Sequence, residues 1–360
     1  MTLEILSAGP LVSVQDRGRR GLRRFGVSAA GPMDAPAHAL ANALCGNPQD
    51  AAVLEFAGMG GQFRSDRPLR FAVTGGDCDI SVDGTPLAPD ESHRLEAGQV
   101  LKIGMLKNTA WGYLAVSGGI DTPLVMGARS THLRFGLGGL CGRALKAGDR
   151  LPLGEESGAD VLLRPAAPLP PPRFADPIRI LLGPQDGYFA PHVLERLTRQ
   201  DFTITAQRDR MASILDGPDM PAERGHDIVS DGTVPGAIQV PGSGRPMVLM
   251  AECQTTGGYP KIATVISADL SRLAQMPTGM RLRFAVVERT AAEAAARAQA
   301  ASLAAVLKGL VTKQTVTLTS EFLLSCDLVG GIFDPEAVAP GNTPETTPGI
   351  VSGAEKKGET

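Results

Sequence analysis

The sequence has few cysteines, and their number and spacing argue against two kinds of stabilising site. Among the 360 residues there are five, Cys45, Cys78, Cys141, Cys253 and Cys326, with no Cys-x-x-Cys pair. An odd number of widely spaced cysteines favours neither a disulfide framework nor a zinc site. We interpret them as reduced, mostly buried thiols of a cytoplasmic protein, and we expect no metal.

The chain also lacks a recognisable targeting segment and a membrane-spanning segment. Residues 1–10 have no basic stretch followed by an apolar core, and no run approaches the roughly 18 uninterrupted apolar residues of a membrane helix. A net charge of -3 gives no sign of a basic, phosphate-tracking domain. We therefore expect a protein of the cytoplasm that contacts neither a membrane nor nucleic acid.

Several common catalytic motifs are missing as well. The sequence has no Gly-x-x-x-x-Gly-Lys-Ser/Thr, no Gly-x-Gly-x-x-Gly that opens a helix, no His-Glu-x-x-His and no Gly-x-Ser-x-Gly. Its own nucleotide loop, metal site and nucleophile elbow are therefore not recognisable. The five scattered histidines receive no role. Met105-Leu106-Lys107 does not resemble a biotinylation site, because the usual Met-Lys-Met context is absent.

What the sequence does contain is glycine and proline, 43 and 28 residues, which fits tight turns between short strands. The proline-dense stretch 164–173 favours polyproline II and divides the chain nearly in half. We predict an N-terminal domain at 1–163, a linker at 164–176 and a C-terminal domain with a terminal helix at 177–334. Residues 335–360, rich in Pro, Gly, Thr, Glu and Lys, are predicted to be a disordered tail.

Short apolar or alternating runs predict strands in both halves, so we expect a mainly β protein with a few helices. The predicted strands are 69–74, 78–82, 111–116, 178–182, 202–205, 246–250 and 281–286. A small residue and a glycine precede a strand at Ala97-Gly98, Ala147-Gly148 and Thr278-Gly279, which suggests two related β-barrels. Glycine before a strand is common in any β protein, so chance recurrence is an alternative.

Helical spacing of apolar residues predicts three helices. The first covers 37–44 with Asp34 as N-cap, and the second covers 189–197. The third runs over 291–307, where Thr290 and Glu293 have capping-box spacing and alanine is frequent. Residues 319–325 are expected to form one more ordered piece.

Three segments combine glycines with polar side chains that packing does not require. The first is 14–21, which contains Gln15, Asp16 and Arg19 and is followed by Arg23 and Arg24. Its arginines could pair with neighbouring carboxylates in a solvated loop, or their forked guanidinium groups could bind an anion.

The second segment is 127–131, with the glycine-rich 136–139 and Arg143 close behind. Glycines here would let backbone N–H groups approach an oxyanion or phosphate, and Arg129, Ser130 and Thr131 would add donors. A turn capped by the two hydroxyls explains the same residues equally well.

The third segment is the densest and comprises 235–241 and 254–261, after the apolar run 248–250. It places an amide, two hydroxyls, two glycines, a phenol and an ammonium group in one short stretch: Gln254, Thr255, Thr256, Gly257, Gly258, Tyr259 and Lys261. We interpret it as a binding loop at a strand end, because a plain hairpin would explain only the glycines.

Taken together, these segments resemble the biotin-dependent carboxyltransferase-like family. That family includes KipA, the C subunits of 5-oxoprolinase, the allophanate hydrolase subunit 2-like proteins and the carboxyltransferase domain of urea carboxylase. The resemblance covers about residues 3–330. Its matching stretches are Gly9-Pro10, 14–19, 31–34, 41–42, 46–47, 118–120, 129–131, 183–185, 209–211, 235–241 and 254–260.

The resemblance implies two cyclophilin-like β-barrel domains with a functional cleft between the halves. The chain departs from the family pattern at 211–215, where glycine and a bulky residue usually follow the methionine. It also has Glu252 where the shorter aspartate is common.

Three functions stay open under this resemblance, and we favour the first. In it, the chain works with the KipI-like (B) and LamB/YcsF-like (A) subunits of a 5-oxoprolinase, and the complex uses ATP to open the lactam of 5-oxoproline to glutamate. A stable lactam resists water, so its oxygen needs activation. The second is carboxyl transfer from carboxybiotin on a partner to a urea-like nitrogen. The third is a KipA-type regulatory protein that binds a kinase inhibitor.

We expect the site to be a composite cleft to which both halves contribute. Asp16, Arg129 and Lys261 are the predicted catalytic residues. Arg129 would clamp an anion, Asp16 would orient Arg129 or Arg19, and Lys261 would add a second positive charge. The predicted substrate-binding residues are Gln15, Arg19, Ser130, Thr131, Gln254, Thr255, Thr256, Gly257, Gly258 and Tyr259.

Overall fold

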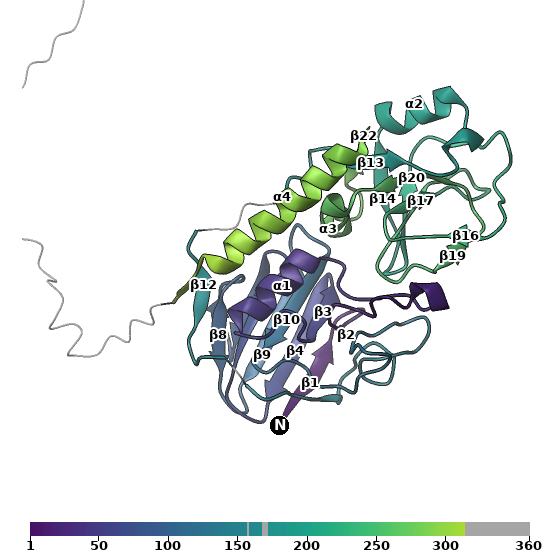
Figure 1. Cartoon of the computed structure of the whole chain (residues 1–360). Helices are drawn as coiled ribbons and strands as arrows, with labels where there is room; N and C mark the ends of the chain where they lie inside the picture. The colour runs from purple at the N-terminus through teal and green to yellow at the C-terminus, as the bar shows by residue number, and fades with distance from the viewer. Residues whose placement is uncertain (157, 168–171, 314–360) are drawn as a thin grey trace, which may run out of the picture. The chain divides into compact units, whose positions relative to one another are not determined.

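The computed structural model describes residues 1–156, 158–167 and 172–313, and Met1–Lys313 forms one compact unit. Strands predominate and helices are few, which confirms the predicted mainly β fold (Figure 1). Within this part, no helix combines the length and the apolar character needed to cross a membrane. The expected ordered piece at 319–325, Cys326 and the predicted tail at 335–360 lie outside the described residues.

The first half forms two antiparallel sheets that share a core. Leu3, Ile5 and Phe63 of one sheet pack with Phe56 and Phe71 of the other. The six-stranded sheet has the order β11 (Arg150–Pro152), β1 (Thr2–Ala8), β4 (Met59–Ser65), β9 (Val100–Leu106), β6 (Cys78–Val82) and β7 (Thr85–Leu87). The five-stranded sheet has the order β2 (Ser13–Gln15), β3 (Val53–Ala57), β10 (Trp111–Val116), β5 (Leu69–Thr74) and β8 (Ser92–Leu95).

The five-stranded sheet is covered on both faces, and every residue of β5 and β10 is buried. Along β10, Leu114 and Val116 point into the core between the two sheets. Tyr113 and Ala115 point the other way, into a second core cluster that also contains Ile180 of the second half. Because side chains alternate along a strand, a sheet covered on both sides needs a continuous apolar run. The two halves thus share one continuous core.

The second half forms an eight-stranded sheet that closes on itself. Its order is β21 (Arg281–Leu282), β14 (Phe202–Arg208), β15 (Ala212–Asp216), β18 (Met247–Leu249), β17 (Ala237–Gln239), β20 (Lys261–Val265), β13 (Ile178–Leu182) and β22 (Phe284–Val286). The first and last strands, β21 and β22, are separated only by Arg283. One chain segment therefore pairs with β14 on one side and with β13 on the other, and this joins the two edges into a barrel.

Two short ribbons lie outside these sheets. β12 (Leu163–Pro165) pairs with β23 (Leu310–Thr312), and β16 (Asp231–Gly232) pairs with β19 (Thr256–Gly257). Arg164 and Pro165, which were predicted to begin the proline-rich linker, are therefore strand residues. Residues 168–171 of that linker lie outside the described part. The proposed domain boundaries stay a prediction.

Four α-helices and two short 3-10 turns complete the described chain. They are α1 (Ala35–Leu44), α2 (Pro191–Arg199), α3 (Ser267–Gln275), α4 (Arg289–Lys308), η1 (Arg23–Phe25) and η2 (Asp186–Tyr188). Asp34 caps α1 as predicted, because its carboxylate accepts from Ala37 N at 3.2 Å. The capping box predicted for α4 is wrong, since that helix begins after Glu288 and has no side-chain cap. Helix α3 was not predicted.

The recurring glycine turns are equivalent in all three places. Gly98, Gly148 and Gly279 have φ values of 83°, 88° and 86°, a left-handed region that suits glycine. Each donates its N–H to a strand carbonyl, namely Ser65, Ile5 and Ile204, at 2.9, 2.8 and 2.8 Å. The pattern therefore marks the same local turn in both halves.

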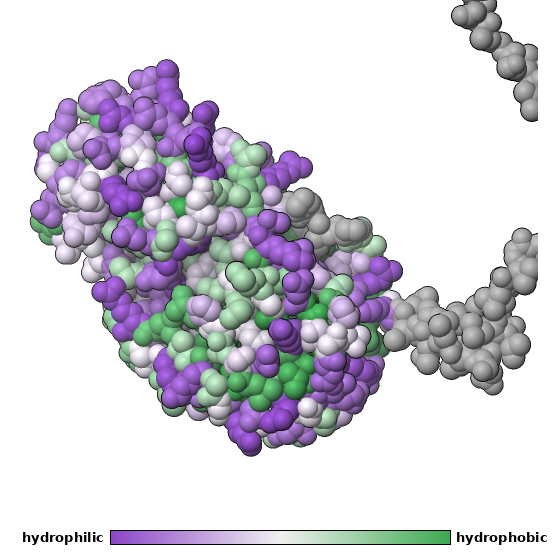
Figure 2. Space-filling view, turned by 180° about the vertical axis from the view of Figure 1, so that it is seen from behind, coloured by the Kyte–Doolittle hydropathy of each residue, from purple (hydrophilic) through white to green (hydrophobic). Residues whose placement is uncertain are grey.

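Surface polarity differs between the halves on the face seen in Figure 2. Hydrophobic residues gather over the lower part, which belongs to the first-half sheets, whereas the upper part is mainly hydrophilic. Large apolar side chains that are more than half exposed in the first half include Phe25, Leu124, Met126 and Phe135. Exposed apolar area of this kind is typical of surfaces that bind other proteins.

Candidate functional site

Asp16 organises the predicted residues of the first half. Its carboxylate accepts from the main-chain N–H of Arg129 at 2.5 Å and from that of Gly18 at 2.9 Å. It also accepts from both N–H and Oγ of Ser130, at 3.2 and 2.5 Å, while Ser130 Oγ accepts from Asp16 N at 3.0 Å. These bonds hold the end of β2 against the segment 129–131, so two segments that are far apart in sequence come together.

Thr131 and Gln15 also form hydrogen bonds where β2 meets the segment 129–131. Thr131 Oγ1 donates to the carbonyl of Val14 at 3.0 Å, and Gln15 Nε2 donates to the carbonyl of Thr131 at 3.1 Å. The guanidinium of Arg129 pairs with the exposed carboxylate of Asp121. Asp16 therefore contacts the main chain of Arg129, while its guanidinium lies against a different carboxylate.

Arg19 is the exception, because most of its donors have no partner. Its side chain is 1% exposed, and Nε donates to the carbonyl of Val125 at 3.1 Å. Nη1 and Nη2 are both buried without a hydrogen-bond partner among the described residues. Burial lowers the pKa of Arg19, and the charges of Asp16 and Glu252 oppose this. A buried cation with unused donors is costly unless an acceptor or anion reaches it.

The glycines that follow allow the loop to pack tightly against Arg129–Thr131. A Cβ on Gly138 would lie 2.2 Å from Ser130 O and 2.3 Å from Arg19 Nη2. A Cβ on Gly139 would lie 2.0 Å from Thr131 Oγ1. These two glycines therefore let the backbone cover the Arg19 side chain, a packing role that the sequence did not predict.

The predicted residues of the second half form another cluster, around Lys261. Lys261 is 3% exposed, and its Nζ donates to Asp231 Oδ2 at 2.8 Å. Gln185 Nε2 reaches the same oxygen at 3.3 Å, and Gln185 Oε1 accepts from Lys261 N at 3.1 Å. This ion pair lowers the pKa of Asp231. Neither Asp231 nor Gln185 had been predicted as a site residue.

The side-chain amide of Gln254 forms a hydrogen-bonded pair with that of Gln239. Its Nε2 donates to Gln239 Oε1 at 3.2 Å, and Gly257 packs directly over Gln239. Thr255 contributes its carbonyl to Thr233 N, at 3.0 Å, at the base of the β16–β19 ribbon. Thr256 and Gly257 form β19, Gly258 follows it, and Tyr259 is 39% exposed.

Arg23 connects the first half with this ribbon. From η1, its Nη2 donates to the carbonyls of Thr233 and Gln254, at 2.6 and 3.0 Å. Thr233 follows β16 and Gln254 precedes β19, so one guanidinium holds both strands of the ribbon at their bases. Composition had favoured a solvated loop for this arginine. The structure instead places its guanidinium on two carbonyls of the other half.

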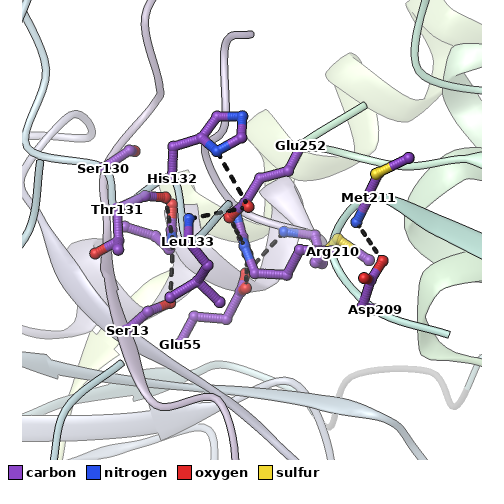
Figure 3. A network of polar contacts seen from close by, with 12 residues as sticks. Ser13, Glu55, Ser130, Thr131, His132, Leu133, Asp209, Arg210, Met211 and Glu252 are labelled. Carbon is purple, nitrogen blue, oxygen red and sulfur yellow. Dashed lines mark hydrogen bonds and ion pairs between the residues drawn. The ribbon is translucent and has the colours of Figure 1, made fainter. Parts of the chain in front are cut away.

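The polar contact between the halves that is most deeply buried involves residues that were not predicted. Arg210 is 1% exposed and donates to Glu252 Oε1 at 2.5 Å and to Glu55 of the first half (Figure 3). It also donates to the carbonyl of Gly31. Burial acts to lower the pKa of Arg210, but Glu55 and Glu252 together raise it above its usual value. Burial raises the pKa of Glu55, and Arg210 opposes this.

The network continues on both sides of Arg210. Glu55 Oε2 accepts from Tyr113 OH at 2.8 Å, and Tyr113 accepts from Asp34 N at 2.7 Å. Gln275 of α3 donates to Asp34 Oδ2 at 2.9 Å, which makes a second buried bond between the halves. On the other side, Glu252 Oε2 accepts from Leu133 N at 3.1 Å.

His132 lies beside Glu252 and has one nitrogen without a partner. Its Nδ1 is 3.5 Å from Glu252 Oε2, and its ring stacks on Phe135 with centroids 4.3 Å apart. Nε2 is buried without a partner among the residues the structure describes. Burial lowers the pKa of His132, although Glu252 opposes this, which favours the neutral ring.

The predicted cleft residues thus occupy two clusters, one around Asp16 and one around Lys261. Across the described part of the chain, no hydrogen bond or ion pair joins a predicted residue of one cluster directly to a predicted residue of the other. Arg23 and the Arg210 network connect the halves instead. Residues 209–211 belonged to a recognised motif, so a signal for Arg210 was present in the sequence. Among the described residues, no group of His, Cys, Asp and Glu could hold a metal.

The chain matches the model of a known family over residues 25–286. It is 38% identical over 284 residues to the C subunit of Escherichia coli 5-oxoprolinase, covering 78% of this chain and 90% of that protein. Its identity to the C subunit of Haemophilus influenzae 5-oxoprolinase is 37% over 287 residues, covering 79% and 91%. The crystal structure of the Kluyveromyces lactis urea carboxylase superposes with a TM-score of 0.77 at 27% identity, covering 84% of this chain and 29% of that one. The chain therefore belongs to the family of the carboxyltransferase domain with subdomains A and B.

Proposed function

We propose that this protein is the C subunit of an ATP-dependent 5-oxoprolinase complex, a hydrolase that opens the lactam of 5-oxoproline to glutamate. The match to two C-subunit relatives over nine-tenths of their length supports this assignment. The same fold accounts for only 29% of the urea carboxylase chain. Carboxyl transfer from a biotinylated partner is the alternative, which the likeness to urea carboxylase supports.

The observation that carries the proposal is the buried guanidinium of Arg19. Within the described part of the chain its two terminal nitrogens have no partner, and a loop closed by Gly138 holds them in a water-poor place. Donors fixed in such a place act strongly on an oxygen that gains negative charge during a reaction. Arg19 would hold the substrate oxygen, and Asp16 would keep β2 and the segment 129–131 in position around it.

Lys261 and Arg129 would supply the further positive charge near the reacting group. Lys261 Nζ carries three donor positions, and Asp231 occupies one of them. We assign ATP to the complex and not to a loop of this chain, because the sequence has no recognisable phosphate loop. The KipI-like (B) and LamB/YcsF-like (A) subunits are the proposed partners, and exposed apolar residues such as Phe25 and Phe135 are suited to contact them.

The test is ATP-dependent glutamate release by the complex reconstituted with each of four variants, Asp16→Ala, Arg19→Lys, Arg129→Lys and Lys261→Ala. Loss of one essential contact should cost about 2 to 4 kcal/mol of transition-state stabilisation. Lysine cannot reproduce the planar fork of arginine, so both lysine variants should be impaired. Circular dichroism and co-purification with the partners check folding and assembly.

Arg20→Lys is the matched control, because Arg20 is exposed and adjacent to Arg19. Its activity should equal that of the unchanged protein. Turnover close to normal in all four folded and assembled variants would show that these residues do not form the site. Carboxylation of urea by the chain with a biotinylated partner, with no glutamate release, would favour the alternative.

A further inference from the structure

Two neighbouring glutamines of the second half each have one side-chain polar atom without a hydrogen-bond partner among the described residues. Gln239 lies on β17 and is 0% exposed, and its Oε1 accepts from Gln254 Nε2 at 3.2 Å. Gln239 Nε2 and Gln254 Oε1 are both buried, and neither has a partner among the described residues. Buried polar side-chain atoms in proteins are nearly always paired, so this donor and this acceptor need an explanation.

The two unpaired atoms determine which chemical groups a ligand must offer them. A side-chain amide offers an oxygen acceptor and an NH₂ donor, and here one glutamine has a free donor while the other has a free acceptor. If both amides are turned over, the bond between them runs the other way, but one donor and one acceptor are still free. Both free atoms belong to the two amides that this 3.2 Å bond joins, so a partner with an N–H and a C=O on one edge matches them in chemistry.

We propose that the amide pair Gln239 and Gln254 binds the edge of a cis amide. The ligand N–H donates to one glutamine oxygen, and its carbonyl accepts from the other glutamine NH₂. A five-membered lactam holds N–H and C=O on one side of its ring, and urea presents the same edge. In naming the lactam of 5-oxoproline as the ligand, the inference rests on the function proposed above.

The positive charge of Lys261 beside the glutamine pair favours 5-oxoproline over urea as the ligand. Gln239 and Lys261 are directly opposite each other on β17 and β20, and opposed residues project to the same face of a sheet. The Lys261 ammonium group keeps donors beyond its bond to Asp231. 5-Oxoproline has a carboxylate that can meet this cation, whereas urea has no charge.

The β16–β19 ribbon covers the pair. A Cβ on Gly257 would lie 2.4 Å from Gln239 Nε2 and 3.4 Å from Gln254 Nε2, so Gly257 sits directly on the amides. The ribbon pairs only Asp231 with Gly257 and Gly232 with Thr256. A ligand that reaches the amides therefore displaces this short ribbon. The hydrogen bonds from Arg23 to the carbonyls of Thr233 and Gln254 limit how far the two ends of the ribbon can move.

Titration calorimetry on the purified full chain tests the site without requiring turnover. The probes are 5-oxoproline, N-methyl-5-oxoproline, which lacks the N–H, proline, which lacks the carbonyl, and urea. We expect 5-oxoproline to bind, and the N-methyl compound and proline to bind about tenfold or more weakly, because each leaves a buried glutamine atom unpaired. Weaker binding of urea would identify the carboxylate as part of the recognised ligand, and tighter binding of urea would overturn the choice of the lactam.

Two variants and one matched control complete the test. Gln239→Glu replaces the NH₂ donor with an acceptor, and Gln254→Met keeps the side-chain length but removes both hydrogen-bonding atoms. Each should weaken 5-oxoproline binding about tenfold or more. Gln207→Glu makes the first change on an exposed residue of the same sheet and should leave the affinity unchanged.

The outcomes separate this inference from the proposed function. If the full chain binds none of the probes, or if both folded variants bind 5-oxoproline normally, the amide pair is not a ligand site. Glutamate release by the complex with an unchanged KM in both variants would retain the function and reject the pair. Binding that depends on the N–H, in a chain whose complex releases no glutamate, would retain the pair and reject the function.

Discussion

Arg210 of the second half and Glu55 of the first form an ion pair in which neither side chain reaches solvent, with exposures of 1% and 0%. The two residues are 155 positions apart in the sequence. Glu252, the carbonyl of Gly31 and Tyr113 complete the hydrogen bonds of the pair. Because both halves supply hydrogen-bond partners to this ion pair, the pair holds the two halves in one relative arrangement.

Loss of Arg210 should destabilise the protein strongly. Arg210→Met keeps apolar volume but leaves Glu55 and Glu252 buried without their cation, at a cost of about 3 to 5 kcal/mol. Urea-induced unfolding followed by circular dichroism measures the change. Arg283→Met is the control, because Arg283 pairs with Asp201 while it is 60% exposed, and it should cost less than about 1 kcal/mol. Equal effects of the two substitutions would contradict a special role for the buried pair.

A second prediction concerns pH. Burial, with a contribution from Asp77, raises the pKa of Asp90 from 3.8 to about 6. Between these values the folded state holds the proton more often than the unfolded state, so stability should fall as pH rises from about 4 to about 6. Asp90→Asn cannot ionise and should lack this part of the pH dependence. Asparagine also tolerates the left-handed backbone at this position, where φ is 58°.

Unfolding free energies at several pH values between 4 and 7 test this prediction. The difference between the Asn variant and the unchanged protein should favour the variant increasingly as pH rises. Asp50→Asn, at an exposed position, controls for the loss of a surface charge. A constant difference across the range would show that Asp90 does not couple to folding.

The sequence predicted most elements whose pattern is local. The runs 69–74 and 111–116 are buried at every residue because their sheet is covered on both faces, and both were found as β5 and β10. Helix α3 was missed because it is short and follows β20 after a single residue, Ile266. The segment 211–215, which departs from the family pattern, begins at a turn: the Asp209 carboxylate accepts from Met211 N and Ala212 N, at 2.7 and 3.0 Å, and β15 begins at Ala212.

The site was only partly predictable, because its contacts join distant segments. Glycine and polar patterns indicated Asp16, Ser130, Gln254 and Lys261 as candidates, but nothing local indicates that Asp16 binds the main chain of Arg129. The partners of Lys261 and Gln254 were missed for the same reason. The sequence has Glu252 where the shorter aspartate is common in the family. In the structure the Glu252 carboxylate accepts a hydrogen bond from Arg210 Nε.

Arg23 should position the ribbon without being needed for the fold. Arg23→Ala removes the bonds to the carbonyls of Thr233 and Gln254, which should cost about 1 to 3 kcal/mol of stability. In the complex, the KM for 5-oxoproline should rise more than kcat falls, because the ribbon covers the amide pair. Arg23→Lys should restore part of the effect. Arg24→Ala is the control, since Arg24 is exposed, and a KM equal in the two alanine variants would contradict the prediction.

The isolated chain should hydrolyse neither ATP nor 5-oxoproline. It has no recognisable phosphate loop, and its relatives are named as subunits. Phosphate and glutamate assays on the purified chain check this, and co-purification with the KipI-like partner at micromolar concentration checks assembly. Substantial turnover by the chain alone, or failure of the two proteins to associate, would count against its place in such a complex.

Gly257→Ala should weaken ligand binding while the protein still folds. The new Cβ would lie 2.4 Å from Gln239 Nε2 and 3.1 Å from Thr233 Cγ2, so the Gln239 amide must move away from residue 257. The atom in the way is the end of a flexible side chain, and overpacking of this kind costs about 1 to 3 kcal/mol of stability. The variant should therefore fold but bind 5-oxoproline about tenfold or more weakly, because the Gln239 amide is displaced from the position in which it would bind the ligand.

Gly258→Ala is the matched control for this last prediction. A Cβ on Gly258 would meet no atom closer than 3.6 Å, the carbonyl oxygen of Ile228, although the residue directly follows Gly257. Both variants are compared by calorimetry well below their unfolding temperatures, so that only folded protein is titrated. Normal affinity in Gly257→Ala would show that the position of the Gln239 amide is irrelevant to binding. Equal loss in both variants would instead attribute the effect to the backbone of the loop.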